Sequence, residues 1–172
     1  MSCRIYMDHA ATTEMLPEVR EAMEPYLREE YGNASTSYDM GVRMHDAIEE
    51  AREKIAWVID AQPEEIFFTS GGSESDNWVI KSVAGEKKNS GKHLITTRIE
   101  HHAVLRSCQY LESLGYEVTY LDVDDYGLVS AKEVVHALRE DTTLVSVMTG
   151  NNEIGTIEPI ADIGAQLRAR GS

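Results

Sequence analysis

Short apolar runs alternate with stretches of helical periodicity from Ile66 onward, and this order is the strongest constraint on the fold. Runs of four to six residues rich in Ile, Leu, Val and Thr are typical of buried strands, whereas apolar residues at every third or fourth position indicate helices. Alternation of the two predicts an α/β fold with a predominantly parallel sheet and flanking helices. The expected strands are 66–69, 93–97, 116–121 and 144–148, and the expected helices are 73–87, 102–114, one opened by a capping box at Ser130 and Glu133, and 160–169 ended by Gly171.

Two helices are expected before this region. Residues 17–31 carry apolar side chains on one face and are followed by Gly32, which predicts the end of the helix. A longer helix is expected from Asp39 or Gly41 to about Asp60, with isoleucines at helical spacing. No repeat or linker divides the chain, so we expect one continuous unit with helices in 1–62 and the α/β part in 63–172.

The composition of the chain excludes some classes of partner and indicates where the protein works. The formal net charge of −14 argues against nucleic acid or an anionic membrane as a partner, since both require a basic surface. Cys3 and Cys108 are too few for a disulfide framework, and Cys108 lies in an apolar helical pattern that favours a buried, unreactive thiol. With no membrane-spanning run and no signal-peptide pattern at the start, we expect a cytoplasmic protein.

The segment IFFTSGGSESDN, residues 66–77, has the pattern of a phosphate-binding turn. An apolar run leads through Gly71 and Gly72 directly into a predicted helix, whose first N–H groups are unpaired. Glycines allow the backbone to approach an anion closely, and Ser73 can add a hydroxyl. The alternative interpretation is an ordinary turn in which Ser73 caps the helix without a ligand.

Three polar loops follow three of the predicted strands: Ser70–Ser73, Glu100–His102 and Asn151–Gly155. In open α/β sheets ligands bind beyond the carboxyl ends of the strands, so we expect these loops to converge. His101 could act as a general base, a metal ligand or a surface on which a ring stacks. A metal site is not favoured, because adjacent histidines cannot easily share one ion and no third ligand has suitable spacing.

Asn152 offers both donors and an acceptor for a phenolic oxygen or a carboxylate, although Asn-Asn before glycine is also ordinary turn chemistry. Glu153 is expected to tie down its loop rather than act in catalysis. A phosphate-binding turn, a flat partner for a ring and a neutral polar group together indicate a phosphorylated aromatic cofactor. Pyridoxal phosphate is the simplest match.

The chain resembles the cysteine desulfurases of the NifS/IscS type, within the class V aminotransferase group of fold-type I pyridoxal-phosphate enzymes. The resemblance extends from about Tyr6 to Gly171. It depends on the motifs YMDHAATT at 6–13, YGNAS at 31–35, FTSGGSESDN at 68–77, EHHAVL at 100–105 and NNEIG at 151–155. Relatives often have Gly-Ala-Thr-Glu where this chain has Gly71-Gly72-Ser73-Glu74, and a proline where it has Ala34.

The resemblance implies that Gly72 and Ser73 bind the cofactor phosphate. It implies that His101 stacks on the pyridine ring and helps proton transfer, and that Asn152 bonds the ring hydroxyl or the substrate carboxylate. It also implies conversion of L-cysteine to L-alanine with an enzyme persulfide, a homodimer, and sulfur transfer to an iron–sulfur scaffold or another acceptor. Residues 1–62 would then serve dimer and small-domain packing, and 63–172 would be the first, incomplete part of the cofactor-binding large domain.

Family members are about twice as long, and the part without a counterpart here holds essential groups. The resemblance places there the Schiff-base lysine, the aspartate that pairs with the pyridinium nitrogen, the catalytic cysteine and the arginine for the substrate carboxylate. The lysines of this chain all lie away from the three loops in the sequence pattern: Lys54, Lys81, Lys87, Lys88, Lys92 and Lys132. We therefore expect no covalent cofactor attachment and no desulfurase activity from this chain alone.

Two alternatives remain open from the sequence. Another class V enzyme, such as a selenocysteine lyase or an aminotransferase, would share the same motifs. A non-catalytic interaction module could instead retain the fold without the lysine-bearing half and associate with a complete subunit.

Overall fold

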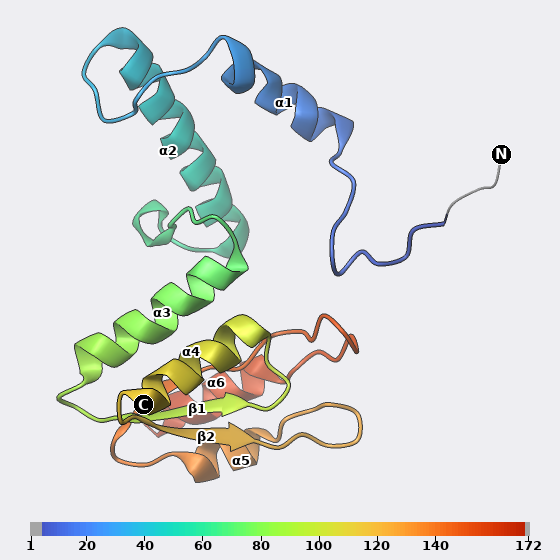
Figure 1. Cartoon of the computed structure of the whole chain (residues 1–172), viewed down its shortest axis with the longest axis vertical. Coiled ribbons are helices and arrows are strands. Elements are labelled where there is room, and N and C mark those ends of the chain that lie inside the picture. Colours follow the sequence, from blue (N-terminus) through green and yellow to red (C-terminus); the bar gives the residue numbers. More distant parts are fainter. Residues whose placement is uncertain (1–4, 171–172) are drawn as a thin grey trace. The chain divides into compact units, whose positions relative to one another are not determined.

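The computed structural model describes residues 5–170, which form two compact units divided between Phe68 and Thr69. Cys3 and Gly171, which the sequence interpretation used, lie outside the described residues. The expected α/β fold with a parallel sheet and flanking helices is confirmed in the second unit (Figure 1). Within the described part, no helix is both long and apolar enough to cross a lipid bilayer.

The first unit is helical. Helix α1, Pro17–Arg28, begins with a proline at its first position, where no intrahelical N–H bond is lost. It ends three residues earlier than expected, because the N–H groups of Glu29 and Glu30 both bond to the carbonyl of Pro25. Helix α2, Asp39–Ile59, has the expected bounds and is followed by a single 3-10 turn, η1, at Pro63–Glu65.

Residues 66–69 form no strand within the described structure, so the expected first strand is wrong for this chain. The carbonyl of Ile66 accepts a hydrogen bond from the guanidinium of Arg52, whose carbon lies 5.1 Å from the centre of the Phe68 ring. A strand requires a neighbour to satisfy its backbone groups, and the sheet described within 5–170 places none beside this segment.

The second unit has a three-stranded parallel sheet in the order β2-β1-β3. The central strand β1 is His93–Thr97, with β2, Glu117–Leu121, on one side and β3, Thr142–Val145, on the other. Strand β3 begins two residues earlier than expected, and a register irregularity between His93 and Leu94 leaves Thr143 as the extra residue in the ladder.

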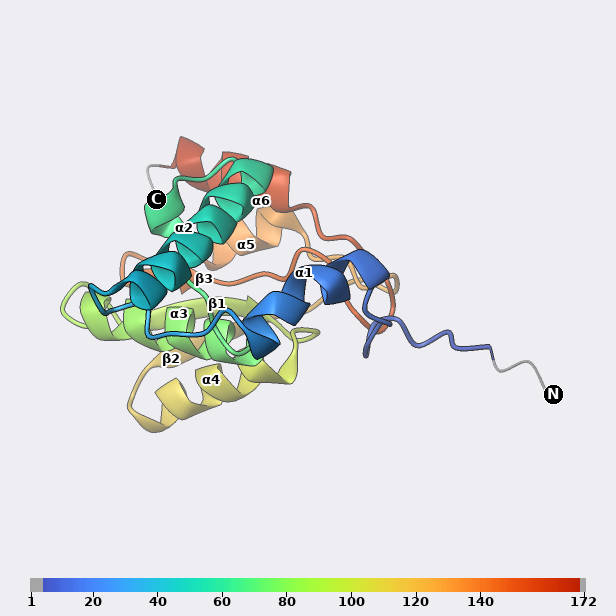
Figure 2. The same ribbon diagram turned by 90° about the horizontal axis from the view of Figure 1, so that it is seen from above.

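Helices cover both faces of this sheet (Figure 2). On one face Leu94 packs with α3, Gly72–Lys87, and α4, His102–Ser113. On the other face Ile95 packs with α5, Ala131–Ala137, and α6, Ile160–Ala169. Adjacent residues of a strand point to opposite faces, so β1 contributes to two apolar clusters and is buried along its whole length.

One alternative interpretation and one expectation are corrected, and a second expectation is confirmed. Gly71, not Ser73, is the N-cap of α3, which leaves Ser73 at the second helical position. Ser130 is the N-cap of α5, but its side chain makes no capping hydrogen bond, so the expected capping box is not formed. Cys108 is buried as expected, and burial raises the pKa of its thiol to about 11.

Candidate functional site

A cavity of about 370 Å³ lies where the chain leaves β1 and β3. Its walls come from the loops after these strands and the start of α4, and they include both His101 and Asn152. The cavity is therefore at the carboxyl ends of adjacent parallel strands, where open α/β sheets bind ligands. Its lining residues are Arg98, Ile99, Glu100, His101, His102, Leu105, Asn151, Asn152, Glu153 and Ile154.

His101 is the N-cap of α4 and presents an exposed imidazole. Its Nδ1 accepts a hydrogen bond from the backbone N–H of Ala103 at 3.1 Å, which satisfies one unpaired donor at the helix start. With Nδ1 as acceptor, the proton of the neutral ring is carried by Nε2. The centre of the His102 ring lies 6.3 Å away at an interplanar angle of 38°, so the two rings do not stack face to face.

The loop after β3 is organised by Asn151 rather than by Glu153, contrary to expectation. The Oδ1 atom of Asn151 accepts hydrogen bonds from the backbone N–H groups of Glu153 at 2.8 Å and Ile154 at 3.0 Å. Asn151 is only 9% exposed, whereas Asn152 is exposed. The two adjacent asparagines therefore divide the work: one holds the loop and the other is available to a ligand.

Gly72 and Ser73 open α3 and do not line this cavity. Within 5–170 their backbone N–H groups have no protein acceptor, and a Cβ added at Gly72 would meet no atom within 4 Å. The carboxylate of Glu74 turns back to accept the N–H of Ser70 at 2.6 Å, a bond that lowers the pKa of Glu74. The helix start thus offers two free N–H donors in open space, which is a suitable place for an anion.

Glu100 is the buried acidic group beside the cavity, and the sequence interpretation assigned it no role. Glu100 is only 6% exposed, and this burial raises the pKa of its carboxyl group. The nearby carboxylates of Asp76, on α3, and Glu158 raise that pKa further, while hydrogen bonds from Met148 and Thr97 oppose the shift. The position of Glu100 after an apolar strand did not predict its burial, because glutamates are mostly exposed.

Two further observations bear on what the site can hold. Among residues 5–170 there is no cluster of three or more His, Cys, Asp or Glu side chains arranged for a metal ion. All lysines of the chain lie within this range, and none of them lines the cavity.

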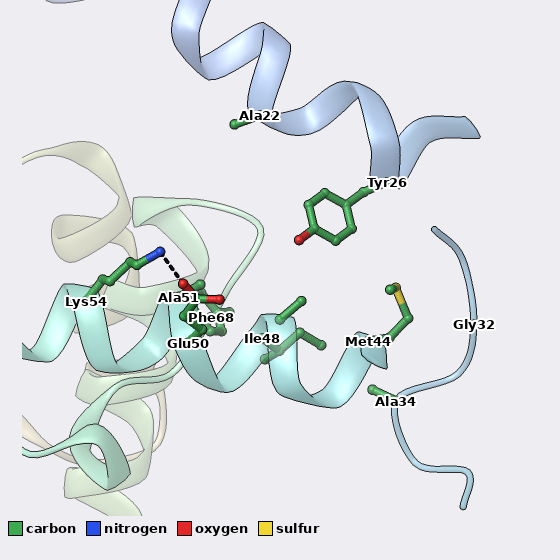
Figure 3. A pocket seen from close by; sticks show the side chains of 11 residues that line it. Ala22, Tyr26, Gly32, Ala34, Met44, Ile48, Glu50, Ala51, Lys54 and Phe68 are labelled. Atoms are coloured by element: carbon green, nitrogen blue, oxygen red, sulfur yellow. Dashed lines mark hydrogen bonds and ion pairs between the residues drawn. The ribbon is translucent and has the colours of Figure 1, made fainter. Parts of the chain in front are cut away.

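A second cavity, of about 600 Å³, lies within the first unit and has a different character. It is mostly apolar and is lined from α1, α2 and the segment around Gly32. Figure 3 shows Tyr26 pointing from α1 toward α2, which carries Met44 and Ile48. Lys54 lines it too, with its Nζ held 2.6 Å from Glu50. This cavity lacks the exposed imidazole and the exposed asparagine amide that line the first one.

Comparison with known proteins identifies a family and relatives that agree with one another. Residues 5–172 match the family described as Aminotransferase class-V. The cysteine desulfurase IscS of Methanosarcina thermophila is 54% identical over 160 residues, which are 93% of this chain and 40% of that protein. The cysteine desulfurase IscS of Dictyoglomus turgidum is 53% identical over 163 residues, 95% of this chain and 41% of the relative.

Solved structures agree with these relatives. A structure described as a NifS-like protein has a TM-score of 0.94 at 42% identity, covering 97% of this chain and 46% of its own. One described as SspA in complex with cysteine has a TM-score of 0.93 at 42% identity, covering 96% of this chain and 48% of its own. The chain thus spans about two fifths of the length of these curated relatives and under half of these solved chains.

Proposed function

Because the chain belongs to the aminotransferase class-V family, we propose that it forms part of the cofactor site of a pyridoxal-phosphate-dependent cysteine desulfurase. The observation that carries this proposal is the joint placement of His101 and Asn152 in one cavity at the ends of β1 and β3. Two loops far apart in sequence supply a flat imidazole and a neutral amide to the same space, as an aromatic ligand with a polar substituent requires.

The residues present fit pyridoxal phosphate. The free N–H groups of Gly72 and Ser73, at the positive end of the α3 dipole, suit a phosphate and need no basic side chain. This matters in a chain with a net charge of −14. The exposed ring of His101 suits stacking on a pyridine, and the exposed amide of Asn152 suits its hydroxyl or a substrate carboxylate.

Bound pyridoxal phosphate would supply an electron sink for the substrate's bonding electrons. The chain's own contribution is to bind and orient. His101 would lie against the ring, and the proton it could transfer is the one at Nε2, because Nδ1 is engaged by Ala103. Asn152 would fix the in-plane orientation of the ring through its amide.

For the complete protein we propose the activity that its relatives' names state. L-cysteine would be the substrate and L-alanine with an enzyme persulfide the products, in a cytoplasmic homodimer that passes sulfur to an iron–sulfur scaffold or another acceptor. The apolar cavity and exposed apolar residues of the first unit support the proposal that residues 1–62 serve dimer and small-domain packing. Residues 63–172 would be the first part of the cofactor-binding domain.

Titration of the pure chain with pyridoxal phosphate, followed by cofactor fluorescence, tests the cofactor assignment. Because no lysine lines the cavity, the expected result is weak, reversible binding that inorganic phosphate competes away and that pyridoxal without phosphate does not match. Equal binding of pyridoxal and its phosphate would contradict the role of Gly72 and Ser73. No binding by the wild-type chain under any condition would leave the interaction module as the better interpretation.

A further inference from the structure

The two loops that supply His101 and Asn152 are joined by side chains reaching in both directions. From the loop after β1, Glu100 extends its Oε1 to the backbone N–H of Met148 at 2.7 Å. From the loop after β3, Asn151 extends its Nδ2 to the carbonyl of Ile99 at 3.0 Å. Each side chain is next in sequence to a proposed ligand-binding residue, and each bonds the backbone of the opposite loop.

We infer that Glu100 and Asn151 are positioning residues that together set the separation of His101 and Asn152. This inference deepens the proposed function, on which its consequence for the cofactor depends.

The contacts of Glu100 favour a mechanical role over a chemical one. The same Oε1 atom also accepts the hydroxyl of Thr97 at 3.1 Å, so one oxygen ties the end of β1 to the end of β3. The residue is buried, and both of its donors are protein groups rather than open positions facing a ligand. Loss of this acceptor would leave the partly buried N–H of Met148 unpaired, so the loop would have to move to find water.

Asn151 uses both ends of its amide. Its oxygen accepts the N–H groups of Glu153 and Ile154, which shapes its own loop, and its nitrogen donates to Ile99 across the gap. The nitrogen also lies 3.5 Å from the sulfur of Met148, the residue that Glu100 holds. Both side chains therefore contact Met148, one at its backbone N–H and the other at its sulfur, and substitution of either residue should loosen the same pair of loops.

Conservative variants separate positioning from simple stability. Glu100→Gln retains an oxygen acceptor, so we expect it to keep the connection, whereas Glu100→Ala removes it. Asn151→Asp retains the acceptor for Glu153 and Ile154 but replaces the donor to Ile99 with an oxygen. Tyr116→Phe is a matched control, because it removes a hydrogen bond of 2.8 Å to the carbonyl of Ala84 at the other end of the unit.

Amide hydrogen exchange of the pure chain, measured by NMR, tests the connection without any cofactor. Glu100→Ala should speed exchange at Met148 by at least about tenfold relative to β1 amides, and Glu100→Gln should stay within about twofold. Asn151→Asp should leave Glu153 and Ile154 protected. Equal exchange at Met148 in wild type and Glu100→Ala would overturn the inference, as would equal acceleration in Tyr116→Phe. If Glu100→Ala does not fold, exchange at Met148 is compared between Asn151→Asp and Tyr116→Phe. Faster exchange in Asn151→Asp supports the inference, and equal exchange overturns it.

Titration with pyridoxal phosphate tests the consequence. Glu100→Ala and Asn151→Asp should each weaken binding about tenfold, whereas Glu100→Gln and Tyr116→Phe should bind as wild type does. Loss of affinity in Glu100→Gln equal to that in Glu100→Ala would show that charge, not position, is the role. A wild-type chain that binds no cofactor contradicts the proposed function, while the exchange experiment still decides the role of the two residues.

Discussion

The imidazole Nδ1 of His101 accepts a hydrogen bond from the backbone N–H of Ala103 at 3.1 Å, so one residue both caps α4 and faces the cavity. The two roles can be separated by substitution. His101→Ala should lose the cap, at a cost of about 1 kcal/mol in the free energy of unfolding, and should also lose cofactor binding. His101→Asn supplies a good capping side chain but no ring. It should unfold at the wild-type denaturant concentration and still bind poorly; wild-type affinity in this variant would rule out ring stacking.

The two glycines before α3 should respond differently to alanine. Gly71 has φ near +157° and ψ near 177°, a region that side chains disfavour, so Gly71→Ala should reduce stability by about 1–3 kcal/mol. Gly72 is the first residue of the helix and a Cβ there meets nothing, so Gly72→Ala should leave stability unchanged or raise it slightly. Relatives often carry alanine at this position, so its methyl group should leave phosphate binding unchanged. Thermal melts and cofactor titrations of both variants measure this, and a loss of stability or affinity in Gly72→Ala as large as that in Gly71→Ala would contradict it.

His93 should make the fold sensitive to acid. Its ring is buried, with Nδ1 2.7 Å from the Thr142 hydroxyl and Nε2 2.8 Å from that of Thr119. Burial, and next the Arg139 cation, lower its pKa, although Asp141 and Glu117 oppose the shift.

A lowered folded-state pKa means that the unfolded chain binds the proton first, so this contribution is intact above about pH 6.5 and is lost as pH falls toward the folded-state value. The loss approaches about 1.4 kcal/mol per pH unit at most. Denaturant unfolding at pH 7 and pH 5 should show it in wild type and in His136→Gln, an exposed-histidine control, but not in His93→Gln. The same pH slope in all three proteins would exclude His93 as the cause.

The isolated chain should self-associate through its first unit. Large apolar side chains there are strongly exposed, with Leu27 at 70%, Trp57 at 84% and Val58 at 72%. Exposed apolar residues gathered on two helices are typical of an interface. Sedimentation velocity should show concentration-dependent oligomers that Leu27→Glu with Val58→Glu reduces, while Ile157→Glu, a comparably exposed position in the second unit, has less effect. A monomer with a cooperative melt at all concentrations would contradict this.

The chain alone should neither turn over L-cysteine nor attach the cofactor covalently. Of its lysines, Lys54 lines the other cavity and is paired with Glu50, and none reaches the space beside His101. Borohydride reduction after addition of pyridoxal phosphate should therefore leave no specifically labelled peptide. Detection of alanine and sulfide from the pure chain, with a heat-treated sample as control, would show that a local residue substitutes for the missing lysine.

Hydrophobic periodicity predicted the second unit well, because burial determines both the strand period and the helix period there. Strand β1 and helix α6 fall on their expected bounds. The segment 66–69 failed for a nonlocal reason, since its sequence is typical of a strand but the described chain gives it no neighbour. The opposite loop determines which of Asn151 and Asn152 turns inward and whether Glu100 is buried. Neighbouring residues in the sequence carry no such information.

Strand β1 lies between two partners that both follow it in the chain. His93 pairs with Glu117 on one side and Thr142 on the other, so synthesis produces the middle of the sheet before either edge. Until both arrive, the ladder of β1 is incomplete, and Ile95 still lacks α6, which follows β3 in the chain. Nonlocal parallel pairing forms slowly. This five-residue strand is therefore where a nascent chain is most vulnerable to aggregation and where a chaperone would have the most to protect.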